Sequence, residues 1–171
     1  MATAPAMLIV FSGLPGTGKT TVARAVAVRL GACFIRLDVI EQAMLRALPD
    51  GAEVGAAGYA VANMVAESNL ALGGCVVADC VSPVEESRAA LRAAAGRASV
   101  RIMEVEVICS DHAEHRRRVE ERQADIPGHI VPSWEAVSRL KYEPWMKPHL
   151  VIDTAFLSSD DAVELVVGTR T

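Results

Sequence analysis

The sequence has few aromatic residues and no long apolar run. Phe, Trp and Tyr together make up 4% of the 171 residues. No apolar stretch approaches the 18 or so residues that indicate a membrane-spanning helix. Residues 1–6 carry no basic group, and the apolar run at 7–11 is too short for the core of a signal peptide. We therefore expect a soluble, cytoplasmic protein with no membrane partner.

Cysteine is also scarce and lacks paired spacing. Cys33, Cys75, Cys80 and Cys109 do not show the pattern of a zinc site or of a disulfide framework. Three of the four fall in apolar, strand-like runs, where cysteine is usually a small buried hydrophobe. A redox or metal role is the alternative interpretation.

An excess of positive charge is missing as well. Lys and Arg number 17 against 21 Asp and Glu, which gives a net charge of −4. This balance argues against a generally basic nucleic-acid binder, and the 51% content of hydrophobic residues argues against a disordered chain. The length suits one domain with its own core, and we assign residues 1–171 to a single domain.

Short apolar runs alternate with helical periodicity along the chain. The runs predict buried strands at 7–11, 33–37, 75–78, 102–109 and 150–152. Helices are predicted at 19–30, 39–47, 56–72, 111–123, 133–141 and 160–167, with another beginning at Ser82 as N-cap and Pro83 as its first residue. The alternation predicts an α/β fold: a three-layer α/β/α sandwich with a five-stranded parallel sheet. In such sheets ligands bind beyond the carboxyl ends of the strands.

A glycine-rich segment follows the first predicted strand. Residues 13–20 read GLPGTGKT and match the phosphate-binding pattern G-x-x-x-x-G-K-[ST] in full. The glycines let backbone N–H groups point at phosphate oxygens, and the following helix adds its positive N-terminal dipole. Lys19 would reach the β- and γ-phosphates, and the Thr20 hydroxyl would ligate Mg²⁺. The residues predicted to bind the nucleotide are Gly13, Leu14, Pro15, Gly16, Thr17, Gly18, Lys19, Thr20 and Thr21.

Other classes of nucleotide-binding protein fit less well. The G-x-G-x-x-G pattern of a dinucleotide site is not satisfied, and no N/T-K-x-D run reads a guanine base. Residues 125–128 match D-x-x-G but follow a charged helix instead of a strand, which indicates coincidence. A motor ATPase usually ends its second signature strand with an acidic pair, whereas Asp79 is followed by Cys80. The pattern that remains is that of a small kinase.

The chain resembles the P-loop small-molecule kinases of the adenylate-kinase-like type. It is most similar to chloramphenicol phosphotransferases and zeta-toxin-like kinases, with the kinase half of polynucleotide kinase as a more distant relative. The resemblance covers nearly the whole chain. It rests on segment 13–21, Asp38, the VVAD run at 76–79, the RVEER run at 118–122, Pro144-Trp145 and the VIDT run at 151–154. It implies transfer of the γ-phosphate of ATP, with Mg²⁺, to a hydroxyl of a small molecule, and a helical lid at about residues 116–132.

The resemblance also implies roles for two acidic residues. Asp38 occupies the place of the acid that accepts the proton of the substrate hydroxyl, while Lys19 and Mg²⁺ neutralise the phosphate charge. Capping of the helix that begins at residue 39 is an alternative role for Asp38, and the two roles are compatible. Asp79 resembles the acid that holds Mg²⁺ through water, with a cap or turn role as the alternative. Asp38 and Asp79 could also exchange roles.

Four arginines lie on the polar helix before the Gly- and Pro-containing segment: Arg116, Arg117, Arg118 and Arg122. In the resembled kinases, lid arginines close over the phosphates and stabilise the transferred charge. We assign this role to Arg118 and Arg122, because their i,i+4 spacing puts them on one helix face. A solvated face paired with the glutamates of the same helix is the alternative.

Few features of the sequence indicate which acceptor is used. The break at 48–55 and the next helix stand where such kinases place their acceptor pocket. Trp134, Tyr142 and Trp145 could wall that pocket or anchor the core. Polynucleotide kinases carry an arginine three residues after the strand-two acid, where this chain has Glu41. With the negative net charge, this favours a small hydroxylated acceptor over a polynucleotide 5′-end. A non-catalytic ATP-sensing module is the third hypothesis.

Overall fold

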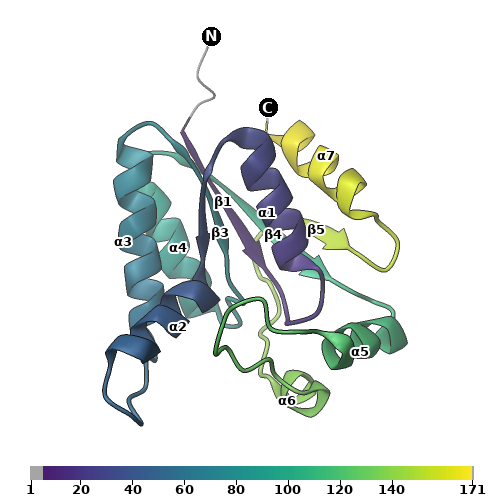
Figure 1. The fold of residues 1–171 in the computed structure, drawn as a ribbon. Helices are drawn as coiled ribbons and strands as arrows, with labels where there is room; N and C mark the ends of the chain where they lie inside the picture. Colours follow the sequence, from purple (N-terminus) through teal and green to yellow (C-terminus); the bar gives the residue numbers. More distant parts are fainter. Residues whose placement is uncertain (1–5, 171) are drawn as a thin grey trace.

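Strands and helices alternate along the chain as the apolar pattern predicts (Figure 1). The computed structural model describes residues 6–170, so residues 1–5, part of the signal-peptide argument, lie outside it. The strands are β1 (Met7–Ser12), β2 (Cys33–Arg36), β3 (Cys75–Asp79), β4 (Arg101–Ile108) and β5 (Leu150–Asp153). The helices are α1 (Lys19–Leu30), α2 (Leu37–Ala47), α3 (Ala57–Ala71), α4 (Glu85–Arg97), α5 (His112–Glu121), α6 (Trp134–Arg139) and α7 (Ser159–Thr169).

The five strands form one parallel sheet in the order β2-β3-β1-β4-β5. The predicted fold class is therefore confirmed, and the strand order is added by the structure. The central strand β1 pairs with β3 on one side and β4 on the other, with Leu8 opposite Val76 and Ile102. Helices α5 and α6 lie beyond the carboxyl ends of the strands (Figure 1).

Alternate residues of β1 face two separate hydrophobic cores. Met7, Ile9 and Phe11 pack with residues of α1 and α7 on one face of the sheet. Leu8 and Val10 pack with residues of α3 and α4 on the other. Complete burial of such side chains contributes about 1.5–3 kcal/mol each, so β1 is held firmly from both faces. The glycine loop that follows it therefore starts from a fixed point.

Helix α4 begins later than the sequence predicts, and its cap is different. Ser82 is completely buried with a φ of 44°, and its N–H donates to the Tyr59 hydroxyl at 3.0 Å. It is therefore not the predicted N-cap, and Pro83 is not the first helical residue. The helix starts at Glu85, whose N–H donates to Glu143 Oε2 at 2.9 Å. A cap that comes from a distant segment leaves no local sequence signal.

Several other helix ends follow the expected local chemistry. Gly31 ends α1 with a φ of 59°, as predicted. Asp111 caps α5 by accepting from the N–H groups of Ala113 and Glu114. Helix α5 stops at Glu121, however, two residues before its predicted end. Within residues 6–170, no helix has the length and apolar character needed to span a membrane.

A buried arginine ties the loop after β3 to the loop before β5. Arg88 has no exposed surface; its Nε donates to Ser82 O at 3.0 Å and its Nη2 to Glu143 O at 2.8 Å. Its guanidinium also lies 4.2 Å from the ring centre of Trp145 and 5.0 Å from that of Tyr142. These two half-buried aromatic residues therefore anchor a buried cation.

Candidate active site

The glycine loop runs between β1 and α1 in a conformation that only glycine adopts easily. Gly16 and Gly18 have φ values of 84° and 87°. The Thr17 hydroxyl donates to Leu14 O at 2.9 Å and holds the loop from within. Because α1 begins at Lys19, the positive end of its dipole faces the loop. This is the arrangement that binds phosphate groups.

Lys19 is paired with the acid at the end of β3. Lys19 Nζ lies 2.5 Å from Asp79 Oδ1, and both side chains are at least nine-tenths buried. The other oxygen, Asp79 Oδ2, has no hydrogen-bond partner among the described residues. A buried carboxylate oxygen without a hydrogen-bond partner is of the hard oxygen type that Mg²⁺ prefers, as is the Thr20 hydroxyl. The metal roles of Thr20 and Asp79 stay predictions.

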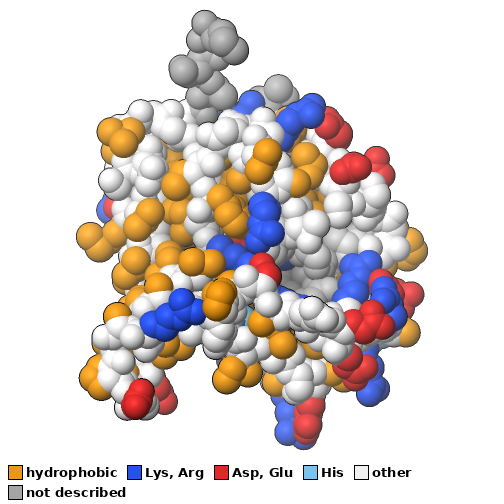
Figure 2. All heavy atoms as spheres, viewed as in Figure 1, with side chains coloured by type: hydrophobic (Ala, Val, Ile, Leu, Met, Phe, Trp, Pro, Cys, Tyr) orange, Lys and Arg blue, Asp and Glu red, His pale blue; other side chains and the backbone are white. Residues whose placement is uncertain are grey.

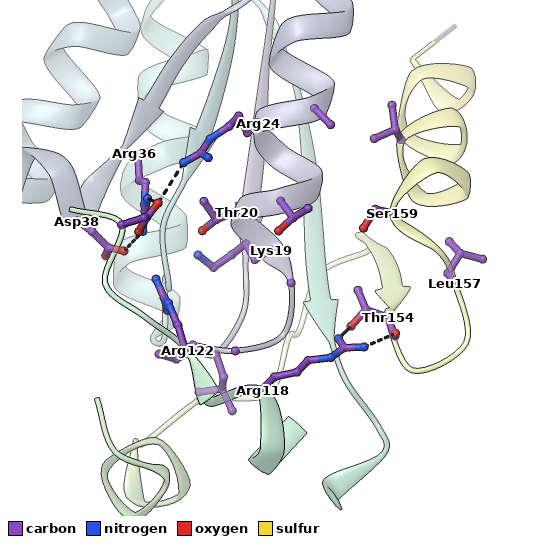
Figure 3. Close-up of a pocket in the computed structure, with 18 of the residues that line it drawn as sticks. Lys19, Thr20, Arg24, Arg36, Asp38, Arg118, Arg122, Thr154, Leu157 and Ser159 are labelled. Carbon is purple, nitrogen blue, oxygen red and sulfur yellow. Dashed lines mark hydrogen bonds and ion pairs between the residues drawn. The ribbon is translucent and has the colours of Figure 1, made fainter. Parts of the chain in front are cut away.

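Asp38 lies in the first turn of α2 and does not cap the helix with its side chain. Instead, its Oδ2 accepts from Arg36 Nη2 at 3.3 Å. Arg36 ends β2, is almost completely buried and also reaches Asp125, which lies between α5 and α6 (Figure 3). Neither Arg36 nor Asp125 was expected in the site. The sequence did offer one signal for Arg36: it is a basic residue near the carboxyl end of a predicted buried strand.

The two predicted lid arginines differ in their surroundings. Arg118 Nη1 donates to Thr154 Oγ1 at 2.8 Å, and Thr154 Oγ1 donates to Thr17 O at 2.7 Å, so Arg118 is linked to the glycine loop. Arg122 comes directly after the last residue of α5. The prediction that the two arginines share one helix face is therefore wrong. In Figure 3, Arg122 extends from the lid side of the pocket toward the space between Lys19 and Asp38.

The other two arginines of α5 fit the solvated-face interpretation. Arg116 pairs with Glu120 at 2.8 Å, and Arg117 pairs with Glu114 at 2.8 Å on an exposed face. Hydrogen bonds from Arg117 and Arg118 lower the pKa of Glu114 to about 2. Arg117 also reaches the rim of the pocket described next.

A pocket of about 1550 Å³ joins these groups. It opens between α1, α5 and the loop before α7, and Figure 2 shows the hollow with Lys and Arg side chains on both sides. Of the predicted site residues, its walls include Leu14, Pro15, Gly16, Gly18, Lys19, Thr20, Thr21, Asp38, Arg118 and Arg122. Gly13, Thr17 and Asp79 are not among its lining residues.

The Asp38 end of the pocket is bordered by residues between α5 and α6 instead of by the segment predicted for the acceptor. Residues 48–55 do not line it, whereas Gln123, Asp125 and His129 do. Trp134 does not line it either; its ring packs edge-on against His112 and His115. Burial and the charge of Asp38 raise the pKa of Glu41.

Comparisons with known proteins agree with this architecture. The profile of a family described as "AAA domain" matches residues 8–137. No match is found among curated proteins. Among solved structures, the chain is similar to a candidate kinase from Chloroflexus aurantiacus, with 22% identity and a TM-score of 0.77, covering 96% of this chain and 98% of that one.

Two further solved structures are named as kinases. A gluconokinase from Sinorhizobium meliloti has 21% identity and a TM-score of 0.66, with 96% of this chain and 91% of that chain covered. The APS kinase CysC of Mycobacterium tuberculosis, in complex with AMPPNP and APS, has 21% identity and a TM-score of 0.69, with 96% of each chain covered. These likenesses show a shared P-loop kinase-like fold. The family profile matches most of the length of this chain, so the chain belongs to the family described as "AAA domain".

Proposed function

We propose that this protein is an ATP-dependent phosphotransferase that moves the γ-phosphate to a hydroxyl group of a small molecule. The observation that carries the proposal is that Lys19 and Asp38 line the same pocket. A phosphate-binding lysine and a carboxylate able to accept a proton thus border one space, as phosphoryl transfer requires.

In this proposal the glycine loop and Lys19 bind the β- and γ-phosphates. Lys19 exchanges part of its contact with Asp79 for phosphate oxygens, so the cation keeps an anionic partner throughout. Thr20 and Asp79 would hold Mg²⁺, which neutralises phosphate charge when it is bound. Arg118 and Arg122 provide further positive charge from the lid.

The transfer step has one acceptor oxygen and one leaving oxygen. The acceptor oxygen forms a bond to the γ-phosphorus while the bond from that phosphorus to the bridging oxygen of ADP breaks. The proton of the acceptor hydroxyl passes to an Asp38 carboxylate oxygen, and ADP leaves with the electron pair of the broken bond. Positioning and charge stabilisation supply most of the acceleration in this chemistry.

Several observations favour a small acceptor. The structural neighbours include proteins named as gluconokinase and APS kinase, both with small acceptors in their names. The net charge of −4 and the presence of Glu41 after Asp38 disfavour a polynucleotide acceptor. The absence of an acidic pair at Asp79-Cys80 disfavours a dedicated ATP hydrolase.

Transfer of label from γ-labelled ATP tests the proposal. The protein is incubated with Mg²⁺ and a fractionated pool of small metabolites, beside Lys19→Ala and the control Lys141→Ala, whose side chain is 83% exposed. Label should enter a discrete soluble compound with the wild type and with the control, but not with Lys19→Ala. Label released only as inorganic phosphate, or equal transfer by Lys19→Ala, would overturn the proposal.

A further inference from the structure

A carboxylate of the lid docks onto a buried guanidinium beneath it. Arg36 Nη1 donates to Asp125 Oδ2 at 2.6 Å, and Arg36 Nη2 donates to Asp125 Oδ1 at 3.0 Å. Arg24 Nη2 adds a third hydrogen bond to Oδ2 at 3.2 Å. The Arg36 side chain is 4% exposed and that of Asp125 is 44% exposed. A two-pronged pair of this kind fixes orientation as well as distance.

The same guanidinium faces the proposed proton acceptor. Arg36 Nη2, which donates to Asp125, also lies 3.3 Å from Asp38 Oδ2, and Arg36 Nε lies 3.9 Å from Asp79 Oδ2. One cation therefore stands among three carboxylates, two from the sheet side and one from the lid. Figure 3 shows the row formed by Arg24, Arg36 and Asp38.

The lid segment around Asp125 is packed against the body of the protein. Ile126 is 8% exposed, and Arg46 of α2 donates a hydrogen bond to Pro127 O. A Cβ on Gly128 would lie 3.4 Å from Gln42 Nε2, an ordinary contact distance, so this turn lies beside α2. The segment therefore covers the Asp38 end of the pocket as one docked unit.

We propose that Asp125 is a positioning residue for phosphoryl transfer: it docks the lid onto Arg36 and, through that guanidinium, orients Asp38 and offsets the positive charge beside it. This inference rests on the proposed function. With Asp125 removed, the full charge of Arg36 would act on Asp38 and make it a weaker base. Docking of the lid and orientation of Asp38 are therefore coupled through Arg36.

Several other charged or titratable groups surround the cluster formed by Arg36, Asp38 and Asp125. The other groups that face this cluster are Lys19 and Arg24 from α1, Glu41 from α2, Asp79 from β3 and Arg122 and His129 from the lid side. Asp125→Asn removes one negative charge next to Arg36 and leaves the rest in place.

Amide hydrogen exchange tests the docking without any acceptor. Wild type, Asp125→Asn and the control Glu120→Gln, an exposed carboxylate of α5, are compared with and without Mg²⁺ and AMPPNP. Exchange in residues 122–132 should be at least several-fold faster in Asp125→Asn, while the control matches the wild type. Equal exchange in all three proteins would overturn the proposal.

Single-turnover transfer from γ-labelled ATP to water, with enzyme in excess, tests the coupling to Asp38. Asp125→Asn should lower the transfer rate at saturating enzyme by about tenfold, less than loss of a whole general base, with the enzyme concentration that gives half of the maximal rate unchanged. In an Asp38→Asn background the same change should have no further effect, because Asp125 acts through Asp38.

Additive effects, or a higher rate in Asp125→Asn, would overturn the positioning role. The proposed function has its own outcome in the same experiments. If AMPPNP fails to protect the glycine loop of the wild type, or the wild type transfers label to no compound of the metabolite pool, the proposed function falls and this inference falls with it. If the wild type does both and Asp125→Asn behaves identically, only the inference fails.

Discussion

A Cβ atom on Gly16 would lie only 2.4 Å from Val119 Cγ2. The glycine loop and helix α5, which we propose as part of a lid, therefore meet with no room for a methyl group between them. His115 of the same helix adds a hydrogen bond of 2.8 Å between its Nε2 and Pro15 O. Through these contacts the lid helix supports the shape of the loop from outside.

This contact predicts the behaviour of Gly16→Ala. The new methyl group must push α5 away, and the residue must keep a φ of 84°, so we expect a loss of about 1–3 kcal/mol in unfolding free energy. Binding of Mg²⁺·ATP should weaken as well. Gly51→Ala is the control, because Gly51 has a φ of 82° and open space around it. Urea unfolding and nucleotide titration of both variants measure the difference, and equal losses would contradict the steric argument.

Lys19→Ala should abolish transfer, with a loss of about 100-fold or more, as removal of one oxyanion donor does elsewhere. It should also destabilise the protein by about 3 kcal/mol, because the buried Asp79 loses its partner. The double variant Lys19→Ala/Asp79→Asn separates these effects. Thermal unfolding should recover in the double variant while transfer stays lost; recovery of transfer would contradict the role of Lys19.

Asp38→Asn should keep the affinity for Mg²⁺·ATP and lose between about 10²- and 10⁴-fold in transfer, the range for a general base. The amide is isosteric and still accepts a hydrogen bond from Arg36, so the fold should be unchanged. Equilibrium binding of AMPPNP and the transfer rate are measured on the same preparation. If nucleotide binding is lost instead, Asp38 belongs to the metal or to the structure.

Arg88→Lys should lower the unfolding free energy by about 3 kcal/mol, because an ammonium group cannot reproduce the planar guanidinium that donates to several carbonyls and stacks on Trp145. The control is Arg139→Lys on an exposed surface, where the Arg side chain is 78% exposed. Chemical denaturation followed by tryptophan fluorescence reports the change, since Trp145 lies against the substituted group. Similar midpoints for the two variants would show that the clamp contributes little.

The lid pair predicts a pH dependence of stability. The Arg36 guanidinium holds the pKa of Asp125 well below its ordinary value. A depressed pKa of an acid in the folded state means that the stabilisation is complete above the unfolded pKa of about 3.9 and is lost as the pH falls. The difference in unfolding free energy between wild type and Asp125→Asn should therefore shrink from pH 6 to pH 3. A difference that stays constant or grows over that range would exclude the pair as its source.

The sequence was sufficient for the fold class and the phosphate loop because both depend on local patterns. A continuous apolar run such as Leu8 to Phe11 predicts a strand buried on both faces, and the spacing from Gly13 to Thr20 predicts its loop. Gly31 likewise ends α1 through its own backbone freedom. The strand order was not predictable, since it depends on contacts between segments far apart in the chain.

The rest of the candidate site depends on such distant contacts. Glu143 caps the start of α4 from 58 residues away. The local sequence therefore favoured Ser82 as the cap, whereas Ser82 is buried before the helix begins. Arg36 and Asp125 are separated by 89 residues, and nothing in either neighbourhood indicates that they pair. The contact between Trp145 and Arg88 also joins two distant segments, and the local sequence around either residue does not indicate it.

The sheet order also constrains how the chain acquires its structure during synthesis. β1 and β2 are not neighbours in the sheet. β3 lies between them, and it is the first strand along the chain with which either of them can pair. Residues 6–74 therefore contain two apolar strands, β1 and β2, whose shared neighbour in the sheet follows later in the chain. Their edges stay unpaired until Cys75–Asp79 emerges, and β1 gains its second neighbour only with Arg101–Ile108. The nascent chain is thus most exposed to aggregation, and most dependent on chaperones, before its third strand is made.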